Sequence, residues 1–214
     1  MLGSRIVLKK GGRDEAEKPF WISFADLMTA LMVLFLLVMS VALLSVTKTV
    51  SEIERLKVQR EQDIDALLEK VKQAADRYPG VTVDKERNVI DFGDRARFDT
   101  ASHQLNPEQA KLLRAFVPEV LVIAQDDLGK RWLKRIVAEG FADQRGTYLY
   151  NLNLSLQRSQ RVLCVLLAPP LPGETPMSQD QLEQIRELFL VGGYSFNSAK
   201  SSFEESRRIE LRLE

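Results

Sequence analysis

The run from Pro19 to Thr47 constrains this chain more than any other stretch, because Asp26 is its only ionisable side chain. The part from Leu27 to Val46 alone is twenty residues long. As a helix it would measure about 30 Å, which matches the hydrocarbon core of a bilayer. The sequence therefore predicts one transmembrane helix over residues 19–47.

Asp26 is a costly residue in such a helix, since a carboxylate at the bilayer centre costs about 2.5–3.5 kcal/mol on insertion scales. Two interpretations are open: the side chain reaches headgroup water near the helix end, or it exchanges protons. Ser23, Thr29 and Ala30 share its helix face. A face of small and polar residues favours packing against other helices over packing against lipid. We therefore predict that Asp26 carries protons.

The composition excludes several classes of protein. The chain has 214 residues with 30 basic and 30 acidic side chains, whereas a nucleic-acid-binding protein would show a basic excess. His103 is the only histidine and Cys164 the only cysteine, so we expect no metal site, no Ser/His/Asp constellation and no intramolecular disulfide. We predict a protein that is not an enzyme and has no cofactor, with the proton as its transported ion. Cys164 is expected in the core.

Basic residues outnumber acidic ones in residues 1–18, which predicts a cytoplasmic tail and a C-terminal part on the far side of the membrane. A cleaved signal peptide is the alternative, but the apolar run exceeds the roughly 7–15 residues of such signals. Residues 48–78 are predicted as a short helical connector. Its apolar residues recur at steps of three and four, at Val50, Ile53, Ile64, Leu67, Val71 and Ala74. This spacing is typical of a parallel two-stranded coiled coil, or of an amphipathic helix that lies on the following domain.

Residues 79–214 mix the patterns of strands and helices, which predicts an α+β domain. Asn106 and Pro107 provide the cap and first residue of one helix, and Ser178 caps another. The expected elements are a hairpin of Val81–Val83 and Val89–Phe92, helices over 106–124, 152–168 and 178–190, and strands over 133–141 and 207–213.

Two stretches of the chain resemble known families. The run Trp21-Ile22-Ser23-Phe24-Ala25-Asp26-Leu27-Met28-Thr29 resembles the Trp-x-x-Thr-Tyr-Ala-Asp-x-Met-Thr motif of MotB-type stator subunits, whose aspartate carries the proton of a motor. The stretches Gly140–Gly146 and Asn151–Arg158 are similar to the Gly-His-Thr-Asp-x-x-Gly and Asn-x-x-Leu-Ser-x-x-Arg motifs of OmpA-like peptidoglycan-binding domains. The resemblance implies a transmembrane helix, a coiled-coil-like connector and an OmpA-like α/β sandwich over residues 79–214.

The OmpA-like resemblance implies roles for five residues. Asp143 and Arg158 match the pair that holds the charged ends of diaminopimelate in the wall peptide, a zwitterion that needs one carboxylate and one guanidinium. Asn151 and Leu154 match residues that shape the pocket, and Tyr150 lies beside them. A surface ion pair between Asp143 and Arg158, worth about 0–1 kcal/mol, is the alternative.

Several departures from the motifs indicate a specialised relative of the flagellar proteins. Phe141 and Ala142 replace histidine and threonine, which predicts a more apolar pocket, and Ser206 stands where the family has asparagine before two arginines. Residues 169–187 look like an insertion. The sequence is similar to the MotB-like component of the Zorya type of antiphage defence system. That resemblance implies an inner-membrane motor in which five copies of a multi-span partner surround a homodimer bound to peptidoglycan. A flagellar-type stator subunit and a passive peptidoglycan tether are the alternatives.

Overall fold

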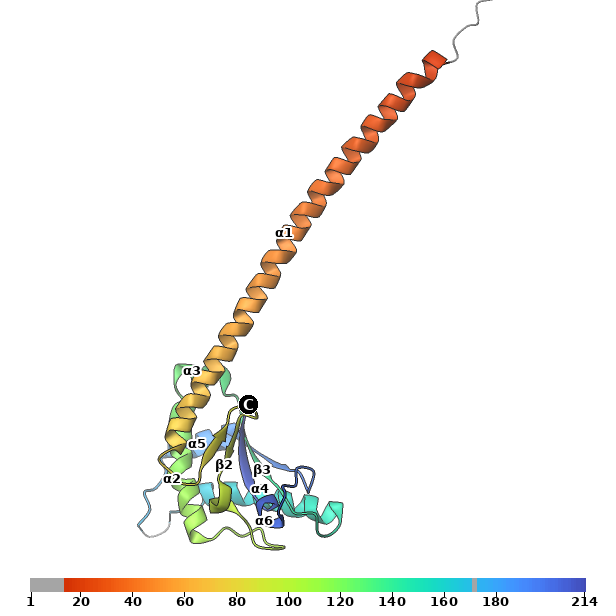
Figure 1. Ribbon diagram of the computed structural model, residues 1–214. Helices are drawn as coiled ribbons and strands as arrows, with labels where there is room; N and C mark the ends of the chain where they lie inside the picture. Colours follow the sequence, from red (N-terminus) through yellow and green to blue (C-terminus); the bar gives the residue numbers. More distant parts are fainter. Residues whose placement is uncertain (1–13, 171–172) are drawn as a thin grey trace, which may run out of the picture. The chain divides into compact units, whose positions relative to one another are not determined.

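The computed structural model describes residues 14–170 and 173–214, with side chains from Trp21 onward, so residues 1–13 of the predicted tail lie outside the described part. The chain divides into two compact units that meet between Val58 and Gln59. In chain order the elements are α1 (Asp14–Ala75), β1 (Thr82–Asp84), β2 (Val89–Asp91), the 3-10 helix η1 (Gly93–Ala96), α2 (Pro107–Ala124), α3 (Asp127–Trp132), β3 (Ile136–Gly140), α4 (Tyr148–Leu167), α5 (Gln179–Leu188), β4 (Phe189–Gly193), α6 (Phe203–Ser206) and β5 (Ile209–Leu213) (Figure 1).

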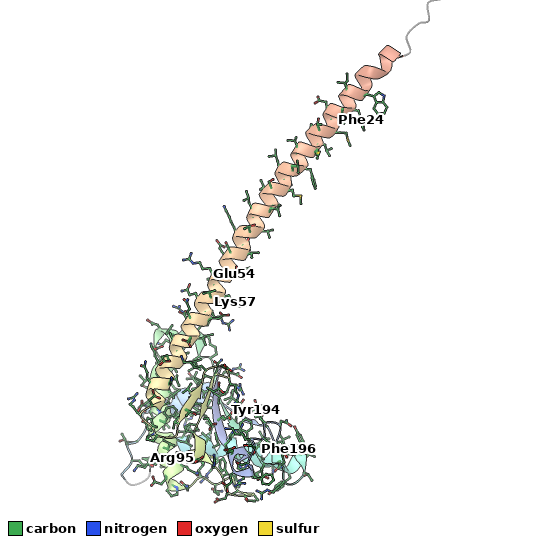
Figure 2. All side chains as sticks on the ribbon, in the orientation of Figure 1. Phe24, Glu54, Lys57, Arg95, Tyr194 and Phe196 are labelled. Atoms are coloured by element: carbon green, nitrogen blue, oxygen red, sulfur yellow. The ribbon has the colours of Figure 1, made fainter. Side chains whose placement is uncertain are left out.

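The first unit consists of α1 up to Val58. Its side chains from Trp21 onward are all exposed, and Figure 2 shows the labelled Phe24 standing away from the helix. The apolar part is long and apolar enough to cross a membrane. Apolar side chains that no other described part of the chain covers suit a lipid or partner-helix environment, as the sequence predicts.

The last part of α1 belongs to the second unit, because apolar residues along it are buried in the core of that unit. Leu67, Leu68 and Val71 are at most 4 % exposed. Polar contacts add to the packing: Lys70 forms an ion pair of 2.5 Å with Asp126. The coiled-coil interpretation is therefore restricted to the residues before Gln59, and the segment after it is the amphipathic helix that lies on the domain.

The second unit contains a five-stranded mixed sheet in the order β1-β2-β5-β3-β4. Neighbouring strands are antiparallel except β3 and β4, which are parallel with Ile136 opposite Phe189. A parallel pair needs a crossover, and here α4 and α5 supply it. The α+β fold class is confirmed.

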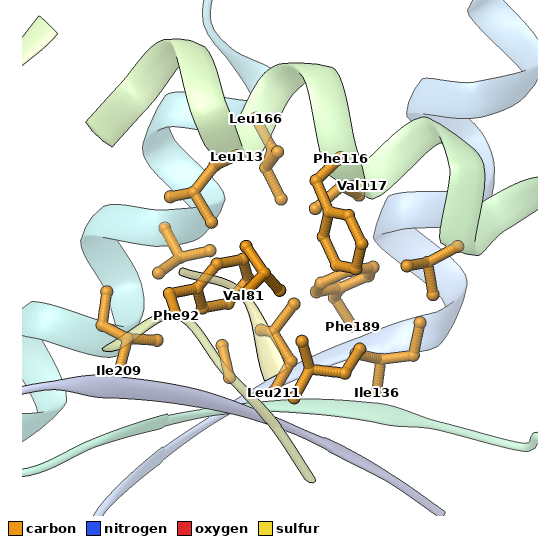
Figure 3. Packing of buried hydrophobic residues seen from close by; sticks show 14 of the residues in the cluster. Val81, Phe92, Leu113, Phe116, Val117, Ile136, Leu166, Phe189, Ile209 and Leu211 are labelled. Carbon is orange, nitrogen blue, oxygen red and sulfur yellow. The ribbon is translucent and has the colours of Figure 1, made fainter. Parts of the chain in front are cut away.

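The main core lies between one face of the sheet and α2 and α4 (Figure 3). Phe116 of α2 is fully buried and meets the ring of Phe92 edge-on, with ring centroids 5.7 Å apart. Ile209 and Leu211 rise from the central strand β5 into the same cluster. Burying each such side chain contributes about 1.5–3 kcal/mol, so this layer holds the sheet and its loops in place.

The opposite face of the sheet carries buried charges. Glu139 of β3 and Glu210 of β5 are cross-strand partners, and neither side chain has exposed surface. Arg212 binds Glu139 with Nε at 2.6 Å and Nη2 at 2.9 Å, and Arg208 binds Glu210 with Nε at 2.6 Å. Two adjacent buried carboxylates would repel each other, and these arginines offset that repulsion.

The structure confirms the elements whose ends carry strong signals. The hairpin forms with Val83 opposite Ile90. Helix α2 begins at Pro107 with a capping box, in which the Asn106 side chain accepts from the Gln109 backbone and the Gln109 side chain accepts from the Asn106 backbone. The final strand also forms, although its Glu210 is buried rather than solvent-facing.

Three predictions were wrong. The helix predicted over 178–190 ends at Leu188, and the next residues form the parallel strand β4. Helix α4 begins at Tyr148 rather than Leu152, because the Thr147 side chain accepts from the Tyr150 backbone as a cap. Cys164 is exposed, since it lies on the outer side of α4 and not on the side that faces the core.

Candidate functional site

Asp26 lies on the exposed apolar part of α1. The hydroxyl of Thr29, one turn away, donates to the backbone oxygens of Ala25 at 3.0 Å and Asp26 at 2.9 Å. Ser40 likewise donates to Leu36, at 2.7 Å. These hydroxyl groups can lie inside a membrane, because the backbone of their own helix accepts their hydrogen bonds.

The Asp26 carboxylate differs from those hydroxyls. A carboxylate only accepts hydrogen bonds, and the carbonyls of its own helix offer it no donor. Among the described side chains none donates to it. Its partner in a membrane must therefore be a proton, water or another polypeptide.

A second candidate site is a pocket of about 240 Å³ in the second unit. All five residues that the sequence predicts for peptidoglycan binding line it. They come from the loop after β3 and from the first three turns of α4, and a loop residue pair before α2 completes the wall. The lining residues are Thr100, Ala101, Asp143, Arg145, Gly146, Tyr150, Asn151, Leu154 and Arg158.

Close backbone packing fixes the loop that carries Asp143. A Cβ on Gly140 would lie 2.0 Å from the backbone oxygen of Ser155 on α4, so only glycine lets β3 end this close to the helix. Gly146 then turns the chain with φ of 98°. The Asn151 side chain donates to the Arg145 oxygen at 2.9 Å and holds the turn from the other side.

Asp143 is 6 % exposed and is bound by two arginines. Its Oδ1 accepts from the backbone N of Arg145 at 3.0 Å and from Nε of the same residue at 3.1 Å. Its Oδ2 accepts from Arg145 Nη2 at 2.6 Å and from Arg207 Nη1 at 3.3 Å. These bonds, led by that of the Arg145 side chain, lower the pKa of Asp143 to about 2.

Arg158 is fully buried, and backbone carbonyls hold its guanidinium. Nε donates to Ser102 at 2.9 Å, Nη1 to Phe141 at 2.7 Å and Nη2 to Asp99 at 3.3 Å. Burial is the main cause that lowers the pKa of Arg158 to about 10, with repulsion from Arg207 second. A guanidinium has five N–H donors, so one remains on each terminal nitrogen for an anion.

The structure brings Asp143 and Arg158 to one pocket but does not join them in the ion pair that was the alternative interpretation: in the described residues Asp143 pairs with Arg145 and Arg207. Tyr150 is 51 % exposed at the rim, whereas Asn151 and Leu154 are buried in the wall.

The prediction that Phe141 and Ala142 add apolar surface to the pocket was wrong. Neither side chain lines the pocket, and Phe141 instead stacks on Tyr194 and under the guanidinium of Arg208. Ser206, in place of asparagine, is buried and closes a loop by accepting from the Lys200 backbone at 2.9 Å.

Sequence reasoning missed Arg145 altogether. Its only local signal is an aspartate two residues earlier, whose side chain accepts the Arg145 backbone N–H in a short turn. Within the described ranges no three His, Cys, Asp or Glu side chains gather where they could hold a metal ion.

Comparisons with known proteins agree with the MotB-type motif. Residues 7–58 match a family described as membrane MotB of the proton-channel complex MotA/MotB. The whole chain is 50% identical, over 215 residues, to Zorya protein ZorB of Escherichia coli O139:H28, strain E24377A / ETEC, and covers 87% of that protein.

Solved structures of low identity resemble the chain as well. One is a putative MotB like protein from Desulfovibrio vulgaris, with 17% identity, a TM-score of 0.47 and coverage of 74% of this chain and 98% of the other. Another is the cell wall anchor of the T6SS from Pseudomonas aeruginosa, with 20% identity, a TM-score of 0.42 and coverage of 67% and 94%.

Proposed function

This chain belongs to the family of Zorya protein ZorB, and from that premise we propose that it is the peptidoglycan-anchored, MotB-like subunit of a proton-driven motor that acts in antiphage defence. The observation that carries the proposal is Asp26: one carboxylate, with no donor among the described residues, on an apolar helix of membrane length. A group that is neutral against apolar surface and ionised against water can move a proton between the two.

The motor needs a partner, because one helix encloses no path for protons. We propose a ZorA-like multi-span membrane protein, five copies of which surround two copies of this chain, with Asp26 facing the ring. Each proton that crosses supplies about 2.3 kcal/mol per 100 mV of membrane potential, which suffices to bias a step between ring positions.

The chain is proposed to cross the bacterial inner membrane once, with residues 1–18 in the cytoplasm and residues 79–214 in the periplasm. The basic excess before the span supports this orientation. The pocket would hold the zwitterionic centre of diaminopimelate, with its carboxylate on Arg158 and its ammonium on Asp143.

The first test is Asp26→Asn, which keeps the shape of the side chain but cannot exchange a proton. We expect proton flux through the partner complex in liposomes to fall to background, and phage protection in cells to disappear. Ser40→Ala is the matched control, because the Ser40 hydroxyl binds only its own helix. Both variants are expected to insert and to copurify with the partner.

Persistent flux in the Asp26→Asn complex would contradict the motor. A passive tether predicts full protection with Asp26→Asn and loss only when the pocket is altered. A flagellar-type stator subunit predicts that the chain restores motility to cells that lack their own stator.

A further inference from the structure

The Asp143 carboxylate is already saturated. Two oxygens offer about four acceptor positions, and four N–H groups from Arg145 and Arg207 fill them. An incoming ammonium group therefore finds no free lone pair on Asp143. One of the four bonds has to break before such a ligand can bind there.

The two arginines differ in how firmly they are held. The Arg207 side chain is 11% exposed, and its Nε donates to the Phe98 oxygen at 2.8 Å, which fixes it inside the domain. The Arg145 side chain is 48% exposed. Its backbone is anchored by Asp143 and Asn151, so the side chain can leave without moving the loop.

The Arg145 guanidinium also rests on weak contacts at the mouth of the pocket. It donates to the Thr100 hydroxyl at 3.3 Å, and its Cζ lies 4.8 Å from the centre of the Phe203 ring, which is itself 51% exposed. A cation over an exposed ring gains about 0.5–1 kcal/mol. These contacts favour the closed position of the side chain without locking it.

Arg158 adds a second requirement for the ligand, namely a carboxylate. This buried cation binds three carbonyl oxygens, and no carboxylate of the described residues pairs with it. Its two remaining N–H groups suit a carboxylate. A ligand that brings a carboxylate and an ammonium together would satisfy Arg158 and replace Arg145 on Asp143 at the same time.

We propose that Arg145 is a built-in competitor: its guanidinium occupies the ammonium subsite on Asp143 and must swing out before the pocket accepts a zwitterionic amino-acid centre. This inference rests on the proposed binding of peptidoglycan. It makes Arg145 a residue that sets affinity and selectivity, because a ligand with only a carboxylate or only an ammonium cannot offset the lost ion pair. The pocket is then selective without a lid.

The test is isothermal titration calorimetry of the full chain in detergent with meso-diaminopimelate as the probe. Arg145→Ala frees Asp143, so we expect the dissociation constant to fall about three- to tenfold, as removal of a competing ion pair of modest strength would do. Arg145→Lys keeps the charge without the fork and should give an intermediate value. Phe203→Ala removes the supporting ring and should lower the dissociation constant by a smaller factor.

Arg186→Ala is the matched control, since it removes an exposed arginine that does not line the pocket. We expect no change with it. An unchanged or higher dissociation constant for Arg145→Ala would overturn the competitor, while binding by the unaltered chain would leave the proposed function standing. Equal tightening by Arg186→Ala would also overturn it, because the effect would then be one of net charge. Absence of binding in every variant, with the domain folded, would refute the proposed wall binding and the competitor with it.

Discussion

At the scale of single residues, the second unit concentrates its unusual chemistry around Asp143. Arg145 and Arg207 form ion pairs with the Asp143 carboxylate, and Arg158 lines the same pocket. Only Arg145 is substantially exposed, and its ion pair is the one that solvent screens most. Added salt is therefore expected to weaken the Arg145–Asp143 ion pair more than it weakens the binding of a ligand in the pocket.

The low pKa of Asp143 makes the domain sensitive to acid. A carboxyl whose folded-state pKa, about 2, lies below its usual 3.8 adds stability that is complete above pH 4 and is lost as the pH falls toward 2. We expect Asp143→Asn to lower the free energy of unfolding by about 1–2 kcal/mol at pH 6, after allowance for the half-exposed partner. Urea unfolding across this pH range measures the difference.

That difference should shrink as the pH approaches 2, because the native carboxyl then becomes neutral too. Asp76→Asn, which alters an exposed carboxylate at the end of α1, is the control and should leave the free energy unchanged. A difference that stays constant from pH 6 to pH 2 would show that the ion pairs of Asp143 do not stabilise the fold.

At the scale of elements, the segment of α1 after Gln59 acts as part of the domain. Val71 has no exposed surface, whereas Val50 on the same helix is 54 % exposed. We expect Val71→Ala to cost about 2 kcal/mol of unfolding free energy through lost burial and a small cavity, and Val50→Ala to cost nothing measurable. Urea unfolding of the full chain in detergent, followed by near-UV circular dichroism, compares the two.

Equal effects of the two substitutions would contradict the packing of α1 on the domain. A reduced dimer fraction in Val50→Ala, with an unchanged midpoint for the domain, would place a coiled coil in the part before Gln59. This pair of variants thus separates the two interpretations that the apolar spacing alone left open.

Elements whose ends are marked by capping or turn residues were predictable from the sequence, and those without such residues were not. Asn106 and Pro107 mark the start of α2, and the polar run between Val83 and Val89 marks a turn. Strand β4 has no such mark: Phe189 continues directly from α5, and only its parallel pairing with β3 makes it a strand. Position 193 in this strand requires glycine, because a Cβ there would lie 2.8 Å from the Leu156 backbone nitrogen.

The same contrast holds for the candidate site. The resemblance to OmpA-like motifs implied that Asp143, Asn151 and Arg158 share one pocket, and in the structure all three line it. The motifs could not reveal that Arg145 hydrogen-bonds to the Asp143 carboxylate, because the side chain of a loop residue follows no helical or strand periodicity. Nor could they tell that Phe141 turns away toward Tyr194.

At the scale of the whole molecule, Asp26 and the pocket around Asp143 lie in different compact units. We expect Asp26→Asn to abolish proton flux in the partner complex while cosedimentation with purified peptidoglycan remains normal. Tyr150→Ala should do the reverse, because Tyr150 is at the rim and its loss leaves the core intact. Flux in liposomes without a wall and cosedimentation with wall sacculi are the two measurements.

Phage protection should be lost in both variants, since a motor needs its force generator and its fixed point together. Tyr150→Ala is a cleaner choice than any change at Arg158, whose guanidinium also holds three backbone carbonyls and therefore the fold. Protection that survives loss of wall binding would mean that the pocket serves another purpose.

The position of β5 has a consequence for biogenesis. This strand comes after all the others in the chain, yet it lies in the middle of the sheet, between β2 and β3. Until it emerges, the two halves of the sheet have no common neighbour and the domain cannot close. With residues 79–214 in the periplasm, as proposed, this topology would keep the polypeptide unfolded, and so competent for export, until its last strand has been made.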